Sequence, residues 1–344
     1  MSDAERGVRD AEPDGSDGDS VVRDGGSAIG DGDSAVGDGT STIRDGKQTT
    51  YSSSAFDCEA CLDPADAFAV VGNEIRLAIL EALWAASDRP VTFSELRRRV
   101  GTRDSAQFNY HLQKLTGQFV EKTDGGYDFR EAGRAVIQAV LSGSLTQDPE
   151  FGPFAVDGEC LDCGVGLQAR YADEQIHVAC PDCGRVHAGW TFPPGGLEGR
   201  SDEEVMAAFN QRARHLLCLA ADGVCPACNG RTETRITDEE APPELEVGVE
   251  YECLRCGHRA HTSIGVALLD DAEVVSFYRD HGVDLNTVPF WTLEWCASDR
   301  HTEILDDDPW LFRVTIELDD ERLAVTLDEE LAVVDAERSA TTTP

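Results

Sequence analysis

Eight of the twelve cysteines form four Cys-x2-Cys pairs, whose residue type and spacing suit metal chemistry. The pairs group into two matched sets, in which 16 and 24 residues separate the two pairs. A Cys-x2-Cys turn directs two thiolates to one metal, so two such turns complete a tetrahedral site with no position left for substrate. A redox function explains one pair at a helix start but not two matched sets. We therefore predict two structural zinc ions. Their ligands are Cys160, Cys163, Cys180 and Cys183 in the first set, and Cys225, Cys228, Cys253 and Cys256 in the second.

Four cysteines lie outside these sets. Cys58 and Cys61 form a fifth pair with no partner pair, and three interpretations stay open: incidental thiols, a zinc ion shared across a dimer, or a thiol switch. Cys218 lies in a helical pattern and Cys296 follows Trp295, so we expect both thiols to be buried as small apolar groups. Many cysteines without a secretory signal indicate a reducing cytoplasm, where cysteines bind metal more often than they form disulfides.

Hairpins and helices are needed to position the cysteine pairs. Alternating residues between the pairs of each set predict a hairpin, and an apolar strand, VHAGWTF or RAHTSIGVALL, follows each second pair. After a linker containing DPEFGPF, we expect a first zinc ribbon over 154–196 and a second over 222–268, joined by a helix over 200–221. The segment 269–338 is expected to hold another helix and a three-stranded meander, with a frayed end at ERSATTTP.

An aromatic cluster lies in the segment PFWTLEWC. Phe290, Trp291 and Trp295 could line a ligand pocket, but core packing is the commoner role of such residues. The chain has no phosphate-binding P-loop, no dinucleotide glycine fingerprint and no His-Glu-x-x-His motif. Because no nucleophile is placed beside a base, we expect this protein not to be an enzyme.

Residues 62–145 have the pattern of helices around a short hairpin. Asp63 and Pro64 are a favourable helix start, and the run NEIRLAILEALWAA continues with an apolar helical face. A short helix, SELRRRV, ends at Gly101, and Asp104 caps the next one. FVEKTDGGYDF predicts a hairpin and EAGRAVIQAVL a last helix. The order helix, helix, helix, hairpin, helix predicts a winged helix-turn-helix domain.

The predicted helix 104–116 has two different faces. Phe108, Leu112 and Leu115 fall on one face at helical spacing, so we expect them to be buried. The other face carries amides, a phenol and a lysine, and no acidic residue after the cap. Such groups bond to base edges and phosphates. Seven basic and three acidic residues lie between positions 89 and 122, a local charge of +4 in a chain of formal charge −37.

The block from Pro64 to Leu141 resembles the ArsR-like winged-helix transcriptional regulators, in particular halophilic archaeal proteins of that type. The resemblance rests on GNEIRLAILEAL, FSELRRRVG, the His-Leu pair of FNYHLQKL and the Asp-Gly-Gly turn. It implies a recognition helix in the major groove and a dimer formed through the first and last helices. Its metal-sensing members carry a cysteine pair that SELRRRV lacks, so metal sensing there is unsupported.

The resemblance also implies positions for contacts with DNA. His111 belongs to the family pattern, and either packing or a phosphate contact would explain it. Lys122 in the hairpin is implied to touch the DNA backbone, and Arg103 and Lys114 join the set because of their charge and position. The DNA-contacting residues that we predict are Arg103, Ser105, Gln107, Asn109, Tyr110, Lys114 and Lys122.

The composition of the chain says more about the salt content of its surroundings than about its binding partner. Acidic residues number 66 against 29 basic ones, and only Lys47, Lys114 and Lys122 are lysines. Such an acidic excess is similar to that of proteins from salt-accumulating halophiles, where charge keeps the molecule solvated. In molar salt, counterion release contributes little to DNA binding, so recognition must depend on base-edge hydrogen bonds and shape.

The remaining observations concern the N-terminal segment and the possibility of a membrane span. Residues 1–57, with four Asp-Gly repeats, predict a disordered acidic tail; calcium binding by the repeats is the alternative. No run of 18 apolar residues occurs, so we expect no membrane span.

We therefore expect an α+β protein: a winged helix-turn-helix domain followed by two four-cysteine zinc ribbons with helices and a C-terminal β-meander. Its expected function is that of a cytoplasmic, sequence-specific transcriptional regulator that binds double-stranded DNA as a homodimer. The ribbons would be structural or would bind a partner in the transcription machinery. Two alternatives stay open: an adaptor that uses the winged helix for docking, and a thiol or metal sensor.

Overall fold

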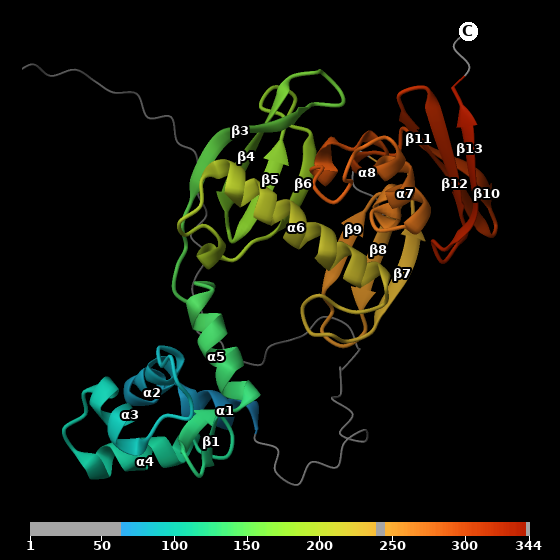
Figure 1. Cartoon of the computed structure of the whole chain (residues 1–344). Coiled ribbons are helices and arrows are strands. Elements are labelled where there is room, and N and C mark those ends of the chain that lie inside the picture. The colour runs from blue at the N-terminus through green and yellow to red at the C-terminus, as the bar shows by residue number, and fades with distance from the viewer. Residues whose placement is uncertain (1–62, 239–244, 342–344) are drawn as a thin grey trace, which may run out of the picture. The chain divides into compact units, whose positions relative to one another are not determined.

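The computed structural model of the chain describes residues 63–238 and 245–341 (Figure 1). The predicted tail 1–57 and the pair Cys58 and Cys61 lie outside the described residues. Two separate clusters of buried apolar side chains organise the rest, one within 71–137 and one within 160–327. The described residues mix helices with small antiparallel sheets, so the predicted α+β class is confirmed. No described helix is long and apolar enough to cross a membrane.

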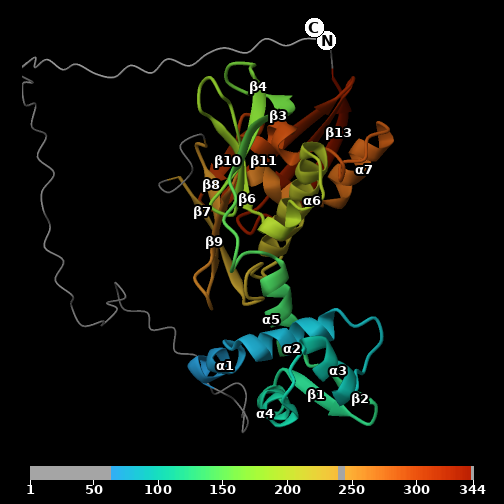
Figure 2. The same ribbon diagram turned by 90° about the vertical axis from the view of Figure 1, so that its left-hand side faces the viewer.

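The first cluster lies among five helices and a hairpin. Figure 2 shows these elements grouped together. The elements are α1 (Pro64–Val71), α2 (Glu74–Trp84), α3 (Phe93–Val100), α4 (Ser105–Leu115), β1 (Val120–Thr123), β2 (Gly126–Phe129) and α5 (Glu131–Leu141).

Side-chain caps set where these helices begin. Asp63 accepts a hydrogen bond from the N–H of Ala65 at the start of α1, as its sequence predicts. The stretch that was expected to hold one helix from Pro64 contains two, because α1 ends at Gly72 and the Asn73 side chain caps α2. Four helices, not three, therefore precede the hairpin.

The hairpin of β1 and β2 is held close to the segment before α3. Lys122 lies opposite Tyr127 in the antiparallel register, and Tyr127 also bridges to Val91. Gly126 has a φ of +141°, and a Cβ there would lie 2.3 Å from the carbonyl oxygen of Val91. This position therefore requires glycine, which supports the predicted turn at Asp-Gly-Gly.

Three antiparallel sheets and six helical segments of the described residues make up the region of the second cluster. The strand order is β3-β4-β5-β6 in the first sheet, β7-β8-β9 in the second and β10-β11-β12-β13 in the third. The strands are β3 (Phe151–Glu159), β4 (Gly166–Ala172), β5 (Gln175–Ala179), β6 (Val186–Thr191), β7 (Thr232–Thr237), β8 (Gly248–Cys253), β9 (Arg259–Thr262), β10 (Thr302–Asp307), β11 (Trp310–Leu318), β12 (Glu321–Leu327) and β13 (Val333–Ala340).

Helix α6 links the first two sheets. It begins with a capping box in which Ser201 and Glu204 bond reciprocally, and it contacts β3, β7 and η3. Its buried face includes Phe209, Ala213 and Leu217. The helical segments of this region are η2 (Pro194–Gly196), α6 (Asp202–Ala221), η3 (Ile264–Leu268), α7 (Ala272–Asp280), η4 (Phe290–Thr292) and α8 (Glu294–Ala297).

Two sequence predictions in this region were wrong, and a third was incomplete. The expected linker enters β3, because the rings of Phe151 and Phe154 stack at 5.5 Å between centroids and hold the segment on its sheet. The expected three-stranded meander forms as β11, β12 and β13, but a fourth strand was missed, because the acidic segment Thr302–Asp307 pairs with β11 as β10. The residues ERSA, expected to fray, pair with β12 as the end of β13.

Other predictions are confirmed, one of them only in part. The hairpins between the cysteine pairs form as β4–β5 and β7–β8. The strand expected after the last pair ends at Thr262 and continues as η3. The aromatic cluster packs in the core: Phe290, Trp291 and Trp295 are buried, as are Cys218 and Cys296.

Candidate metal centres and candidate nucleic-acid interface

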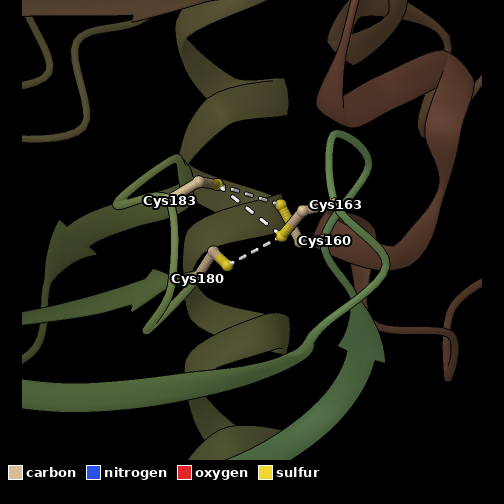
Figure 3. Close-up of side chains that lie close together, drawn as sticks. All are labelled: Cys160, Cys163, Cys180 and Cys183. Carbon is tan, nitrogen blue, oxygen red and sulfur yellow. Dashed lines mark hydrogen bonds between the residues drawn. The ribbon is translucent and has the colours of Figure 1, made fainter.

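The first four predicted zinc ligands come together at one end of the β3–β6 sheet (Figure 3). Cys160 and Cys163 lie in the turn after β3, and Cys180 and Cys183 lie in the turn after β5. The Sγ atoms are 3.5 Å apart between Cys160 and Cys183, and 3.4 Å apart between Cys163 and Cys180. A tetrahedral zinc site with Zn–S bonds of about 2.3 Å places its sulfurs about 3.8 Å apart. The cluster fits one tetrahedral metal ion.

The second set forms a matching cluster. The Sγ atoms of Cys225 and Cys256 are 3.7 Å apart, and those of Cys228 and Cys253 are 3.5 Å apart. Gly230 approaches this cluster closely, because a Cβ there would lie 3.1 Å from the Sγ atoms of Cys228 and Cys253. The space around the sulfurs thus depends on a glycine two residues after Cys228, in the first pair of this set.

One backbone pattern occurs at all four Cys-x2-Cys turns. In each turn the N–H of the first cysteine bonds to a carbonyl five residues later, and its carbonyl accepts from the residue four positions later. That later residue has a positive φ of 57 to 78°. Glycine and asparagine adopt this conformation at little cost, and their place directly after the second cysteine was a readable signal in the sequence. These residues are Gly164, Gly184, Asn229 and Gly257.

Main-chain donors favour thiolate in each cluster. The N–H of Cys183 is the largest cause that lowers the pKa of Cys180, to about 7. Burial works to raise the pKa of Cys253, but N–H groups of Cys256 and Arg255 outweigh it and bring that pKa to about 7 as well. Since metals bind the thiolate form, Cys180 and Cys253 are prepared to bind a cation.

Polar contacts around the first cluster connect distant segments. Asp162, between the two cysteines of the first turn, accepts from Arg185 at 2.9 Å and also from Arg300. Arg300 donates further to the carbonyl of Leu161. The neighbouring Asp299 accepts from the N–H of Glu246, just before β8. The loop after α8 therefore touches both cysteine modules, a contact that the sequence did not indicate.

The charged contacts of the second module lie on its sheet instead. Glu250 is 2% exposed and lies 3.8 Å from Arg235 and from Arg259. Glu252 pairs with the same two arginines at 3.2 and 3.1 Å. This ladder crosses β7, β8 and β9, so it stiffens the sheet and does not hold the cysteine turns.

All the predicted DNA-contacting residues are exposed on α4 or beside it. Tyr110 is 57% exposed, and the Nζ of Lys114 lies 5.7 Å from the centre of its ring. The opposite face of α4 is fully buried through Phe108, Leu112 and Leu115, as predicted. The exposed set is Arg103, Ser105, Gln107, Asn109, Tyr110, Lys114 and Lys122.

The join between α3 and α4 explains how this surface is presented. Helix α3 ends at Gly101 in the left-handed conformation, with a φ of 74°. Asp104 then caps α4 by accepting from the N–H groups of Ala106 and Gln107. The Asp104 carboxylate is thus hydrogen-bonded within the turn between α3 and α4. Its position leaves no acidic side chain on the exposed face of α4.

His111 is placed for packing rather than for a phosphate contact. Its ring is partly buried, and its Nδ1 is buried without a hydrogen-bond partner among the described residues. Burial, and then the charge of Arg76, lower the pKa of His111. A neutral ring at the edge of the core follows.

Comparisons with known proteins identify families but no individual relative. The model described as "Domain of unknown function (DUF7347)" matches residues 64–140, which hold α1 to α5. The model described as "Domain of unknown function (DUF7351)" matches residues 157–333, which hold both cysteine clusters. No curated protein and no solved structure matches the chain. Because the second match spans more than half of its residues, the chain belongs to the family described as Domain of unknown function (DUF7351).

Proposed function

We propose that this protein is a sequence-specific DNA-binding transcriptional regulator whose winged-helix domain, residues 62–145, reads the major groove with α4. One observation carries the proposal. The exposed face of α4 offers amides, hydroxyls and cations and no acidic side chain, in a chain of formal charge −37. An ordinary solvent-exposed helix in so acidic a chain is expected to carry Asp or Glu on its exposed face.

The local geometry supports this proposal. Helices α3 and α4 meet through a tight turn, and the hairpin of β1 and β2 follows α4 with Lys122 exposed on it. A helix-turn-helix places its second helix in the groove and its first helix across the backbone. Gln107 and Asn109 carry the amide groups that pair with adenine edges, and each good base contact contributes about 1–3 kcal/mol of discrimination.

A homodimer is part of the proposal. Phe68 on α1 is 77% exposed, an unusual position for a large apolar side chain in this chain. A second copy packed on α1 would cover it and would give the two-fold symmetry that operators of dimeric readers show.

We assign zinc to both cysteine clusters and a structural role to the metal. Four cysteines close each site, so no ligand position is open for substrate. Bound zinc supplies a cross-link between two turns of the backbone. The protein's own part is to hold the eight thiolates with the repeated main-chain pattern described above.

The test is selection from random duplex DNA in molar KCl, with the zinc-loaded chain and a Gln107→Ala/Tyr110→Ala variant. We expect the parent to enrich a two-fold-symmetric motif and the variant to bind that motif about a hundredfold more weakly, as two lost contacts imply. Gln147→Ala, an exposed amide outside the winged-helix domain, is the matched control and should behave as the parent.

An adaptor is the second candidate, because apolar side chains are exposed at the cysteine turns. Val165, Val186 and Leu254 are 37, 47 and 45% exposed. Exposed apolar groups of this kind mark protein contacts when they gather at one surface. If the selection enriches no sequence with either parent or variant, the regulator is rejected and the adaptor becomes the better account.

A further inference from the structure

The described residues enclose a cavity of about 190 Å³ in the region of the cysteine modules, distinct from both clusters. Strand β6 of the first module, strand β9 of the second, the middle of α6 and the segment of α8 all contribute walls. Small-molecule sites occur preferentially where such separate parts of a protein meet.

The walls of the cavity are largely apolar. Trp190 and Phe290 supply aromatic rings, and Leu217 and Val266 supply aliphatic groups. Among the described residues that line it there is no Asp, Glu, Lys or Arg, although 28% of the chain is charged. An ionised ligand would lose its hydration without gaining an ion pair, so the cavity suits a neutral molecule.

A few polar groups converge on this apolar space. The imidazoles of His187 and His261 line it, and His187 is only 7% exposed. The buried hydroxyl of Thr262 has the hydroxyl of Tyr251 as a neighbour. Because a hydroxyl offers one donor and two acceptor positions, hydrogen-bonding capacity remains for a ligand.

The two strands add main-chain groups. β6 is the edge of the four-stranded sheet and β9 is the edge of the three-stranded sheet. An edge strand directs alternate N–H and C=O groups away from its sheet, where they lack a ladder partner. A planar ligand with donors and acceptors on its rim matches such edges better than an aliphatic one does.

The walls are held in place before any ligand arrives. Ser263 Oγ donates to the carbonyl of Cys296 at 2.6 Å, which ties the start of η3 to α8. Gly265 lies so close to α8 that a Cβ there would be 1.8 Å from the carbonyl oxygen of Trp295. The Nε1 of Trp295 donates to the hydroxyl of Tyr278 at 2.7 Å. These contacts hold the walls formed by η3 and α8 in place without a ligand.

We propose that this cavity binds a neutral, planar heteroaromatic molecule of about the size of indole. A dry apolar cavity of about 150 Å³ admits benzene, so one of 190 Å³ admits a somewhat larger ring system. The ring packs against Trp190 and Phe290, and its polar edge bonds to imidazole, hydroxyl or strand-edge groups. The site is independent of DNA binding and would give this protein a small-molecule ligand.

The test measures the binding of indole to the zinc-loaded full chain by titration calorimetry and ligand-observed NMR. We expect saturable binding at one site. Benzoate, a planar anion of similar size, should bind at least about tenfold more weakly, because no lysine or arginine lines the cavity to offset the loss of its hydration.

Two variants locate the site. Ala297→Leu places a larger side chain in the cavity, and Val186→Trp covers its rim, where Val186 is 47% exposed. Each should weaken indole binding by about tenfold or more. Ala272→Leu, on the exposed start of α7, makes the same change outside the cavity and should leave indole binding unchanged.

Three results would overturn the proposal: no saturable binding of indole by the parent, equal binding of benzoate, or full binding by both cavity variants. Unchanged melting temperature and zinc content show that a variant has folded. Because the readout is indole binding, its failure leaves the DNA-binding proposal untouched, and the reverse also holds.

Discussion

Residues 64–140 carry ten acidic and ten basic side chains, whereas residues 157–333 carry 37 acidic and 13 basic ones. The first region is electrically neutral by this count, and the second has the acidic surface of the chain as a whole. A high net charge solvates a protein but repels a polyanion and strains the compact state. The contrast shows that charge is distributed by region, and the neutral region is the one whose α4 we propose to bind DNA.

The two regions also differ in what holds them together. Residues 64–140 have an apolar cluster and helices capped by Asp63, Asn73, Thr92 and Asp104. Residues 157–333 have their own apolar core, and in addition two four-cysteine clusters at the ends of sheets. We infer that metal cross-links offset the self-repulsion of the acidic region, while the neutral region needs none.

Removal of metal should have the largest effect, because it should unfold one region and leave the other folded. Zinc contributes about 10–16 kcal/mol to folding in small zinc-binding peptides, so Cys180→Ser or strong chelation should unfold much of 157–333. Residues 64–140 should keep their helices. Hydrogen exchange resolved by peptide measures both regions in one sample. Loss of protection in 64–140 to the same extent would contradict the separate origins of their stability.

Cys218→Ala is the control for that experiment. Cys218 is buried in α6 and belongs to neither cluster, so its loss costs core packing but no metal ligand. The variant should bind as many zinc ions per chain as we propose for the parent, namely two.

Arg300→Ala should weaken metal binding at the first cluster and leave the second cluster unchanged. Arg300 bonds to Leu161 and Asp162 in the first turn, and it contacts no residue of the second set. Contacts that orient metal ligands typically change affinity by about 10–100-fold, and the exposed position of Arg300 favours the lower end. Competition with a chromophoric chelator should show one weakened site of two.

Arg313→Ala is the matched variant for Arg300→Ala, since Arg313 also makes an exposed ion pair, with Glu303 across β10 and β11. It should leave both zinc affinities unchanged. Equal weakening of both sites by Arg300→Ala would mean that this residue supports the fold in general and not the first cluster.

The smallest expected effect concerns Arg103 and Lys122. Both are exposed, and no ion pair engages either of them within the described part of the chain. If each contacts one phosphate, replacing both with alanine should reduce the slope of log K against log salt by about 1.8. Affinities for the selected duplex across a range of KCl concentrations measure this slope. An unchanged slope would remove both residues from the interface, whereas in molar KCl the affinities should converge.

Local signals explain why much of the architecture could be predicted. Asp104 and Gly101 fix the ends of two helices through caps that depend on a few neighbouring residues. The cysteine spacing likewise determines which thiols meet. The exposed and buried faces of α4 followed from helical periodicity alone.

The errors have physical causes too. β10 was missed because its acidic residues suit a loop, and only pairing with β11 makes it a strand. The contact of Arg300 with Asp162 spans 138 positions of sequence, and no local pattern reports it. The break at Gly72 and Asn73 was readable, since glycine ends helices and asparagine caps them, but the apolar periodicity on both sides concealed it.

The central claim is that the neutral region, through α4, is the part of this protein that touches bases. Its most direct test is photo-crosslinking to the selected duplex with a photoreactive amino acid placed at Tyr110 in one sample and at Val186 in another. Both positions are exposed, one on α4 and one beside a cysteine cluster. We predict crosslinks to bases within the motif from Tyr110 and none from Val186. Crosslinks from Val186 alone would contradict the account.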